Sequence, residues 1–557
     1  MKNCAKAIET AKLFEGKLGE ENIISEIFDY LNFDCMARLF VDPCELDANI
    51  RSFYNTRSLD DLTEIIRLIE EGKRFAAVDE KALVLQVKNY IIEHLTENIT
   101  FEQVAREFHI SYYYLVHLFK KTSGQSMSQF RTYKRLEKAA FMLLRGDDKI
   151  SDIACACGFE SVSYFSEAFI KKVGDTPSNF RARLADYTIH PFYNLDDLIL
   201  LTKMPKISFL SDKAERIGGP VRYSTVYAPC KEFGLFMHEA AVIYYKGVLY
   251  ASWYTCPEKE LVGYTPILAR RSYDNGETWG EVEIIAEDKT EKILYCPPIF
   301  GICDGKLYLM LNQMVAPDHI HSLDLYVLNE ENGKFEMLWS RPVPFKLNTN
   351  VVTLPNGKLI LPGRLAKLDG FPNTPAVMIS DSGKIDAEWR IVKAAEDGSL
   401  PDGERLVHPE ATLILCDDTL YMFNRNDHRR VPLVYVSKDY GETWSEAHAH
   451  DIPYINSKIY TGELEDGRYY LIANTDKKNR SVLEMFISEK GKMCFNKRLL
   501  LLDCEKDDDI NVACHYPAAV EKEGVLSIIA TMNYLKDGKK TRGAVLFKVD
   551  LAEHFAF

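Results

Sequence analysis

The C-terminal part of the chain repeats one pattern six times: a short apolar strand, a turn centred on glycine or aspartate, and a second apolar strand. Successive copies begin about 50 to 60 residues apart, and each is too short to bury both of its faces alone. Hairpins at such a period predict a β-propeller, in which every sheet packs against two neighbours. Six copies predict six blades. The copies lie at 240–253, 298–311, 350–363, 411–424, 460–473 and 517–530.

A second repeat lies upstream and is helical. Residues 111–131 and 161–181 carry the same residue at eight positions, including a shared Phe-Arg pair, at an offset of fifty residues. Each copy follows a short amphipathic helix with a small residue, Ala105 or Ala154, where a second helix can cross closely. A serine then caps that second helix. The pattern predicts two successive helix-turn-helix motifs.

Charge and cysteine content restrict the possible functions. The formal net charge is −14, yet residues 81–183 contain 15 Lys and Arg against 11 Asp and Glu. A basic segment in an acidic chain is typical of a DNA-binding module. Thirteen cysteines without a CxxC pair favour reduced thiols, no metal and no cofactor. The sequence has no apolar leader and no run of eighteen apolar residues, so we expect a cytoplasmic protein that does not enter a membrane.

The duplicated segment resembles the DNA-binding domain of the AraC (arabinose-regulator) family of transcription factors over about a hundred residues. The resemblance implies sequence-specific binding to double-stranded DNA and control of carbohydrate uptake and degradation genes. The matching positions are Ile99-Thr100, Val104-Ala105, Ile110-Ser111, Tyr114-Leu115, Leu118-Phe119-Lys120-Lys121, Gly124, Phe130, Arg135-Leu136, Ala139, Ile153-Ala154, Gly158-Phe159, Tyr164-Phe165, Phe169, Gly174, Thr176-Pro177-Ser178 and Phe180-Arg181.

The DNA-reading face follows from helical periodicity. If Phe119 points inward, Tyr113, Val116 and His117 lie on the opposite face and can meet base edges in a major groove. In the second motif this face includes Glu167, where family members often have a cationic or amide residue. Glu167 either accepts a hydrogen bond from cytosine N4 or is a solvated charge at the rim. The predicted DNA contacts are Tyr112, Tyr113, Val116, His117, Lys120, Lys121, Arg131, Ser163, Ser166, Glu167, Lys171 and Arg181.

These patterns predict a multidomain α plus all-β chain. Residues 1–80 have helical periodicity and predict a small domain that either forms a homodimer or braces the DNA-binding helices. Residues 81–185 form the double helix-turn-helix domain, in which a long helix holds the two motifs one DNA repeat apart, roughly 34 Å. Residues 186–233 are expected to be a linker and first strand, and residues 234–557 the propeller.

Two blades contain the sequence SxDxGxTW, at 272–279 and 437–444, and a degenerate copy lies at 488–495. In this turn the Asp and Ser/Thr groups can bond the backbone and Gly can adopt a positive φ. The motif resembles the Asp-box, or BNR repeat, of the sialidase family. It is structural, so it indicates the fold and not the chemistry.

The sialidase resemblance implies a site on the propeller axis. Tyr516, in His-Tyr-Pro, matches the tyrosine nucleophile, and Glu410, in His-Pro-Glu, matches its supporting glutamate. Arg425 and Arg480 match two of the three arginines that bind the substrate carboxylate.

Two parts of the sialidase set are missing. His238 stands where the first arginine is expected, and Arg364 is a candidate replacement cation. The acid/base aspartate is also absent, and Glu258 and Glu260 are the nearest carboxylates, with Glu260 the candidate acid.

Three hypotheses follow. In the first, the chain is a transcription regulator of the AraC type whose propeller binds a sugar or glycan effector. In the second, it is an intracellular sialidase-like glycoside hydrolase that carries a DNA-binding domain. In the third, the propeller is a docking platform for proteins. Because the catalytic set is incomplete, the sequence does not decide whether the propeller is an enzyme.

Overall fold

A computed structural model divides the chain into two compact units, residues 1–186 and 187–557. Most of the helical region expected over 1–80 lies outside the described residues, but its helix α4 spans Leu59–Phe75. Among the described residues, no helix is both long and apolar enough to cross a membrane. The structure describes residues 49, 52, 53, 55, 56 and 58–555, except for 76–79, 109, 218–220, 318, 367–372, 455, 476–479, 505–512 and 537–538.

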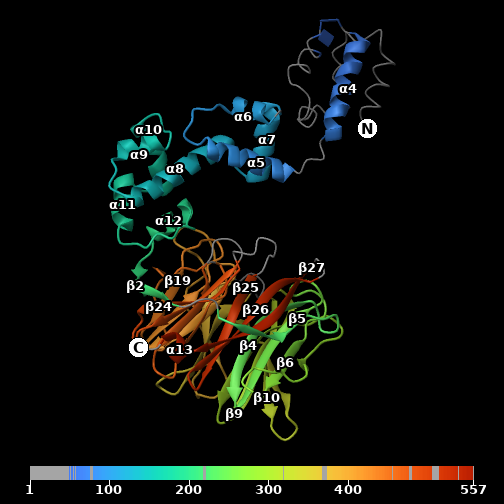
Figure 1. The fold of residues 1–557 in the computed structure, drawn as a ribbon, viewed down its shortest axis with the longest axis vertical. Helices are drawn as coiled ribbons and strands as arrows, with labels where there is room; N and C mark the ends of the chain where they lie inside the picture. The colour runs from blue at the N-terminus through green and yellow to red at the C-terminus, as the bar shows by residue number, and fades with distance from the viewer. Residues whose placement is uncertain are drawn as a thin grey trace. The chain divides into compact units, whose positions relative to one another are not determined.

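The first unit contains the duplicated helices (Figure 1). Side-chain oxygens of Ser111 and Ser161 each accept a hydrogen bond from the backbone N–H three residues later, and both helices end at a glycine with positive φ. The predicted pair of helix-turn-helix motifs is confirmed. The helices are α5 (Glu80–Glu93), α6 (Phe101–Glu107), α7 (Tyr112–Ser123), α8 (Met127–Arg145), α9 (Ile150–Ala156), α10 (Val162–Val173) and α11 (Pro177–Leu184).

The two motifs have the same core. Phe119 and Phe130 meet edge to face with ring centroids 5.6 Å apart, and Phe169 and Phe180 repeat the contact at 5.3 Å. All four rings are buried. The residues that repeat at the fifty-residue offset therefore include two equivalent aromatic pairs. Each pair packs the second helix of its motif against the helix that follows.

The second unit is a ring of six sheets, which confirms the predicted six-bladed propeller. Each blade is a meander of antiparallel strands whose apolar faces pack against the neighbouring blades. Blades one to three contain β4 (Phe236–Tyr245), β5 (Val248–Cys256), β6 (Ile267–Ser272), β7 (Glu283–Ala286); β8 (Leu294–Cys303), β9 (Lys306–Ala316), β10 (His319–Asn329), β11 (Lys334–Arg341); β12 (Phe345–Leu347), β13 (Val352–Thr353), β14 (Leu359–Leu365), β15 (Thr374–Ser380) and β16 (Arg390–Lys393).

Blades four to six each take an additional outer strand from the segment that precedes the repeats. A short C-terminal helix, α13 (Leu551–Phe555), ends the described chain. These blades contain β17 (Ala411–Cys416), β18 (Thr419–Asn424), β19 (Leu433–Ser437), β20 (His448–His450); β21 (Tyr460–Glu463), β22 (Tyr469–Asn474), β23 (Val482–Ser488), β24 (Phe495–Asp503); β25 (Ala513–Lys522), β26 (Val525–Lys536) and β27 (Lys539–Asp550).

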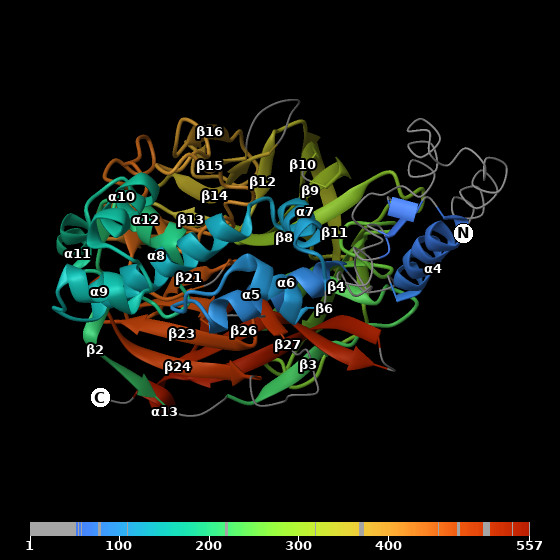
Figure 2. The same ribbon diagram turned by 90° about the horizontal axis from the view of Figure 1, so that it is seen from above.

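Residues 186–233, which were expected to be a linker and a first strand, contain a helix and three strands that belong to three different blades. After α12 (Leu195–Leu201), the segment supplies β1 (Lys206–Ile207) and β2 (Leu210–Ile217), which pair in parallel with β20 and β24. Its last strand, β3 (Tyr223–Tyr227), pairs antiparallel with β27 and completes blade six (Figure 2). Each addition covers a sheet edge that would otherwise expose unpaired backbone groups. Two of these three strands are short, and their alternation is too brief to detect in the sequence.

The two Asp-boxes have the same bonding. In the first, Asp274 accepts hydrogen bonds from the backbone N–H and the hydroxyl of Thr278, and the Ser272 hydroxyl accepts from the N–H of Gly276 at 2.7 Å. The hydroxyl of Thr278 is the main cause that lowers the pKa of Asp274 to about 2. Gly276 has φ +89°, so this turn requires a glycine. The boxes fasten turns and contribute nothing to the cavity described below.

Two of the buried histidines in the second unit are His190 and His450. His190 stacks on Phe192 with ring centroids 5.1 Å apart, and its Nε2 lies 3.1 Å from the carbonyl oxygen of Asp451. Burial lowers its pKa to about 4, and burial also lowers the pKa of nearby His450 to about 3. Both rings are therefore neutral in the folded protein at neutral pH.

These histidines predict acid-sensitive stability. Below about pH 6.5 the unfolded chain binds protons that the folded protein excludes, so stability falls with pH until the folded pKa is reached near 4. His190 alone accounts for a loss of about 3 kcal/mol over that window. Urea unfolding of the full chain at pH 7, 6 and 5 measures it. His190→Asn should flatten the pH dependence, whereas substitution of exposed His321 should not; equal slopes in all three proteins would contradict the assignment.

Candidate nucleic-acid interface and ligand cavity

The outer face of α7 has the composition expected for DNA reading. Tyr113 is 68% exposed, His117 is exposed, and Tyr112 and Val116 are partly exposed beside them. The opposite face packs into the core of the first motif. It consists of Tyr114, Leu115, Leu118 and Phe119, all buried.

The corresponding helix of the second motif, α10, exposes Ser163 and Glu167 and partly exposes Ser166. It also exposes Tyr164 by 52%, although the equivalent Tyr114 of the first motif is only 4% exposed. The exposure of Tyr164 could not be predicted from the sequence, because both copies have a tyrosine at this position and the first is buried. The difference arises from packing and has no counterpart in the pattern.

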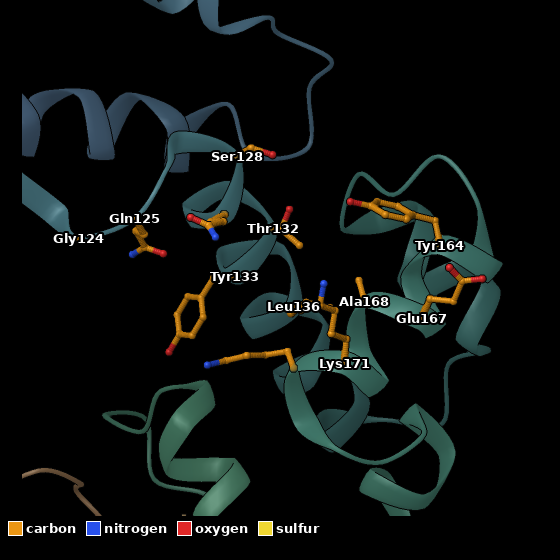
Figure 3. A pocket seen from close by; sticks show the side chains of 12 residues that line it. Gly124, Gln125, Ser128, Thr132, Tyr133, Leu136, Tyr164, Glu167, Ala168 and Lys171 are labelled. Atoms are coloured by element: carbon orange, nitrogen blue, oxygen red, sulfur yellow. The ribbon is translucent and has the colours of Figure 1, made fainter. Parts of the chain in front are cut away.

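A cavity of about 700 Å³ is lined by residues of α8, of α10 and of the turn before α8. Figure 3 shows Thr132 and Tyr133 of α8 on one side and Tyr164 and Glu167 of α10 on the other. The Nζ of Lys172 lies 5.1 Å from the centroid of the Tyr133 ring. Glu167 and Lys171 therefore line the gap between the motifs as well as belonging to the predicted DNA-binding set.

Two of the predicted DNA contacts, Arg131 and Arg181, form hydrogen bonds within their own motifs. Arg131 donates a hydrogen bond to the carbonyl of Ile99 at 2.7 Å, and its guanidinium stacks on Phe101 at 4.4 Å. Arg181 donates to the carbonyls of Leu143 and Asp148 at 3.0 and 2.7 Å. Each arginine thus ties its motif to the segment before that motif's first helix. Arginine serves both roles, so the residue type alone does not separate a brace from a phosphate contact.

The lysines of the interface are more accessible. Lys120 and Lys171 are exposed at the ends of α7 and α10, where the negative helix ends also favour a cation. Lys121 is exposed too, with its Nζ 3.1 Å from a carboxylate oxygen of Glu80. A surface ion pair of this kind is weak, so it leaves Lys121 accessible to a phosphate.

A second cavity, of about 370 Å³, lies among the blades of the propeller. Seven of the eight propeller residues singled out in the sequence line it: His238, Glu260, Arg364, Glu410, Arg425, Arg480 and Tyr516. Three further charged residues that sequence reasoning missed also line it, namely Glu239, Lys346 and Arg542. Glu258, the second acid candidate, is exposed and does not line the cavity.

Arg425 forms the centre of a hydrogen-bond network. Its Nη1 donates to the carboxylate of Glu410 at 2.9 Å and to the phenol oxygen of Tyr516 at 2.8 Å. Its Nη2 lies 2.7 Å from a carboxylate oxygen of Asp427. Arg425 is only 12% exposed, so this network is largely shielded from solvent. Burial disfavours the charged form of Glu410, but Arg425, Lys458 and Arg364 outweigh that effect and lower its pKa.

Tyr516 lies at an irregular point of β25. The strand has a register shift between His515 and Ala518, and Tyr516 itself has φ +56°, a region that non-glycine residues rarely occupy. Burial raises the pKa of the phenol well above 10, although Arg425 and Arg480 oppose the shift. The phenol is therefore protonated in the unliganded protein.

Three other residues that line this cavity have positive φ: Glu239 at +48°, Leu261 at +54° and Arg480 at +64°. Glu239 lies at a register shift in β4, and its carboxylate is buried 2.8 Å from the Nζ of Lys458. The Arg480 guanidinium lies 5.6 Å from the centroid of the Tyr516 ring. Backbone conformations of this kind cost energy and gather where a site requires particular side-chain positions.

His238 and Glu260 lie on the same side of the cavity. The His238 ring is buried 4.1 Å from the Tyr516 ring, and its Nε2 is 3.9 Å from a carboxylate oxygen of Glu260. Burial lowers the pKa of His238 well below 6.5, so its ring is neutral. Glu260 accepts a hydrogen bond from the Tyr254 hydroxyl at 3.2 Å, and burial together with Glu239 raises its pKa.

The cavity therefore combines a cation-rich wall with a tyrosine, a carboxylate of lowered pKa and a carboxylate of raised pKa. Arginine and lysine groups in a concave site suit an anionic ligand, and several hydrogen-bonding groups suit the hydroxyls of a sugar. Across the described ranges, no group of His, Cys, Asp and Glu side chains has the arrangement of a metal site.

Comparison with known proteins assigns both modules. The sequence profile of the BNR repeat-like domain matches residues 247–528, half of the chain, and the chain belongs to this family. The profile of a helix-turn-helix domain matches residues 104–183. The predicted AraC-type DNA-binding module and BNR propeller are both confirmed.

The curated relatives resemble the helix-turn-helix segment. An uncharacterised HTH-type transcriptional regulator, YijO of Escherichia coli, is 38% identical over 101 residues, 18% of this chain and 36% of that protein. The transcriptional activator RhaR of Yersinia pestis is 38% identical over 80 residues, 14% of this chain and 28% of that protein. The chain spans about a third of the length of these relatives.

Solved structures resemble the propeller more distantly. The NanB sialidase of Streptococcus pneumoniae is 11% identical with a TM-score of 0.45, covering 60% of this chain and 71% of that one. The Trypanosoma rangeli sialidase in complex with sialic acid is 14% identical with a TM-score of 0.45, covering 60% of this chain and 59% of that one.

The different environments of Arg131 and Lys120 predict different consequences of substitution. Arg131→Gln should lower the free energy of unfolding by about 1 to 3 kcal/mol, because a carbonyl loses its charged donor and Phe101 loses its stacking partner. Lys120→Gln should leave stability unchanged and reduce the salt dependence of binding to a random-sequence duplex by about one counterion. Urea unfolding and binding titrations over a salt series measure the two effects. The reverse assignment of effects would show that Arg131 is the phosphate contact.

Proposed function

We propose that the protein is a sequence-specific transcription regulator of the AraC type whose propeller binds a sugar or glycan effector and so controls carbohydrate utilisation. One observation carries the proposal: a chain with a DNA-binding module also contains a cation-rich cavity that gathers Arg364, Arg425, Arg480 and Tyr516. A ligand that binds one conformation of the chain more tightly than another shifts the population toward it. That difference in affinity is the means by which a bound sugar would alter DNA binding.

The effector proposal predicts that acidic sugars stabilise the propeller. At a hundred times Kd, a ligand that binds only the folded state adds about 2.7 kcal/mol. Calorimetric melting of the full chain with N-acetylneuraminic, glucuronic and galacturonic acids tests this, with glucose as the neutral reference. Arg480→Gln should reduce the shift, because its guanidinium lines the cavity. The absence of a shift with every sugar would contradict the proposal.

DNA reading by the first motif predicts a change of sequence preference in His117→Ala, because His117 is exposed on the outer face of α7. Selection from randomised duplexes measures the preference. Lys120→Gln is the matched control, since loss of a phosphate contact should weaken all sequences alike. An unchanged preference in His117→Ala would show that another face of α7 reads the bases.

A second candidate function, glycoside hydrolysis, is favoured by the raised pKa of Glu260, which lines the same cavity as Tyr516. In this mechanism Tyr516 attacks the anomeric carbon, Glu410 accepts its proton, and protonated Glu260 donates a proton to the leaving oxygen. Tyr516→Phe should abolish turnover. Glu260→Gln should abolish cleavage of natural glycosides and spare aryl glycosides, whose leaving groups need no proton. Turnover that survives Tyr516→Phe would exclude the tyrosine as nucleophile, and no turnover by the unmodified chain favours the sensor.

A further inference from the structure

The charges around the propeller cavity are only partly balanced. Arg425 lies between Glu410 and Asp427, at 2.9 and 2.7 Å, so two carboxylates oppose its single charge. Glu239 is likewise neutralised by Lys458 at 2.8 Å. Arg425 is thus committed to the protein, where it holds the Tyr516 phenol. The ligand's charge must be met by other cations.

Arg542 is a cation on the cavity wall that interacts electrostatically with Glu260 but lies beyond ion-pair distance of that carboxylate. No ion pair or side-chain hydrogen bond joins its guanidinium to any residue that the structure describes, and the side chain is partly exposed. The guanidinium instead stacks on the ring of Phe236, 4.2 Å from the centroid. Its own backbone N–H donates to the carbonyl of Leu235 at 3.1 Å, which anchors β27 to the start of β4. Stacking fixes the plane of the guanidinium and leaves its edge N–H groups available to a planar anion.

Arg542 lies close to His238, because both contact Phe236. Phe236, on which it stacks, lies 6.0 Å from the ring of His238, centroid to centroid. His238 is the residue that stands where the sialidase resemblance places the missing first arginine. A cation from blade six therefore reaches the part of the cavity where blade one has a buried, uncharged ring.

We propose that Arg542 binds the anionic group of the ligand, in place of the arginine absent at position 238, and so sets the specificity of the cavity for acidic sugars. Arg480 supplies the second cation. The Nη2 of Arg480 donates a hydrogen bond to the carbonyl of Asn456 at 2.9 Å. Arg480 therefore has fewer N–H donors left for a two-point contact with the ligand's anionic group. This inference rests on the proposed function, because it names the charge that the effector carries and the residue that reads it.

The test is a cycle that removes one charge from the protein and one from the ligand. Affinities of the full chain are measured by calorimetry for N-acetylneuraminic, glucuronic and galacturonic acids and for the methyl ester of each. The unmodified chain should prefer an acid over its ester by about ten- to a hundredfold, the range of a charge-assisted hydrogen bond. Arg542→Gln should bring the two affinities close together, and Arg542→Lys should restore part of the preference.

The matched control is Arg341→Gln. Arg341 also stacks on an aromatic ring, Trp339, at 4.3 Å, but lies on β11 away from the cavity, and its substitution should leave the preference unchanged. A full preference for the acid in Arg542→Gln, or no preference in the unmodified chain, would overturn the role of Arg542 while leaving effector binding intact. If the unmodified chain binds neither member of any pair, the proposed function is contradicted as well.

Discussion

A propeller blade has two apolar faces and stays folded only while both are covered, so the ring must close. Closure here depends on β3 (Tyr223–Tyr227), which completes blade six by pairing with β27 near the other end of the chain. That antiparallel pairing joins residues separated by more than three hundred positions. The cavity depends on it, because β25 and β27 of the closed blade hold Tyr516 and Arg542 against residues of blades one, four and five.

Within the cavity, electrostatics rather than packing determines the arrangement. Arg425 connects Glu410 and Asp427 from its own blade to Tyr516 of blade six. A buried arginine with two carboxylates and a phenol is satisfied only when all of its partners are in place. The same bonds explain why the phenol lies where it does although its backbone adopts an unfavourable φ.

Much of this architecture could be predicted from the sequence, because repeats and fixed spacings are local patterns. The fifty-residue offset pointed to Phe119 and Phe169, and the strand pattern located six inner hairpins. What the sequence did not reveal depends on contacts between distant segments. Arg542 lies on β27, between β26 and β3 of blade six, with no motif around it, and Glu239 directly follows a residue that was singled out. The opposite exposure of Tyr114 and Tyr164 likewise comes from neighbours and not from residue type.

The segment between the duplicated helices and the first repeat determines where the propeller unit begins. Because β1, β2 and β3 are strands of three different blades, the first propeller strand begins at Lys206 and not at residue 234. A propeller fragment that began at residue 234 would lack these strands and would leave the edges of β20, β24 and β27 uncovered. The boundary between the two compact units lies at 186–187, so the 47 residues from 187 to 233 belong to the propeller unit and would have to be kept in any isolated propeller.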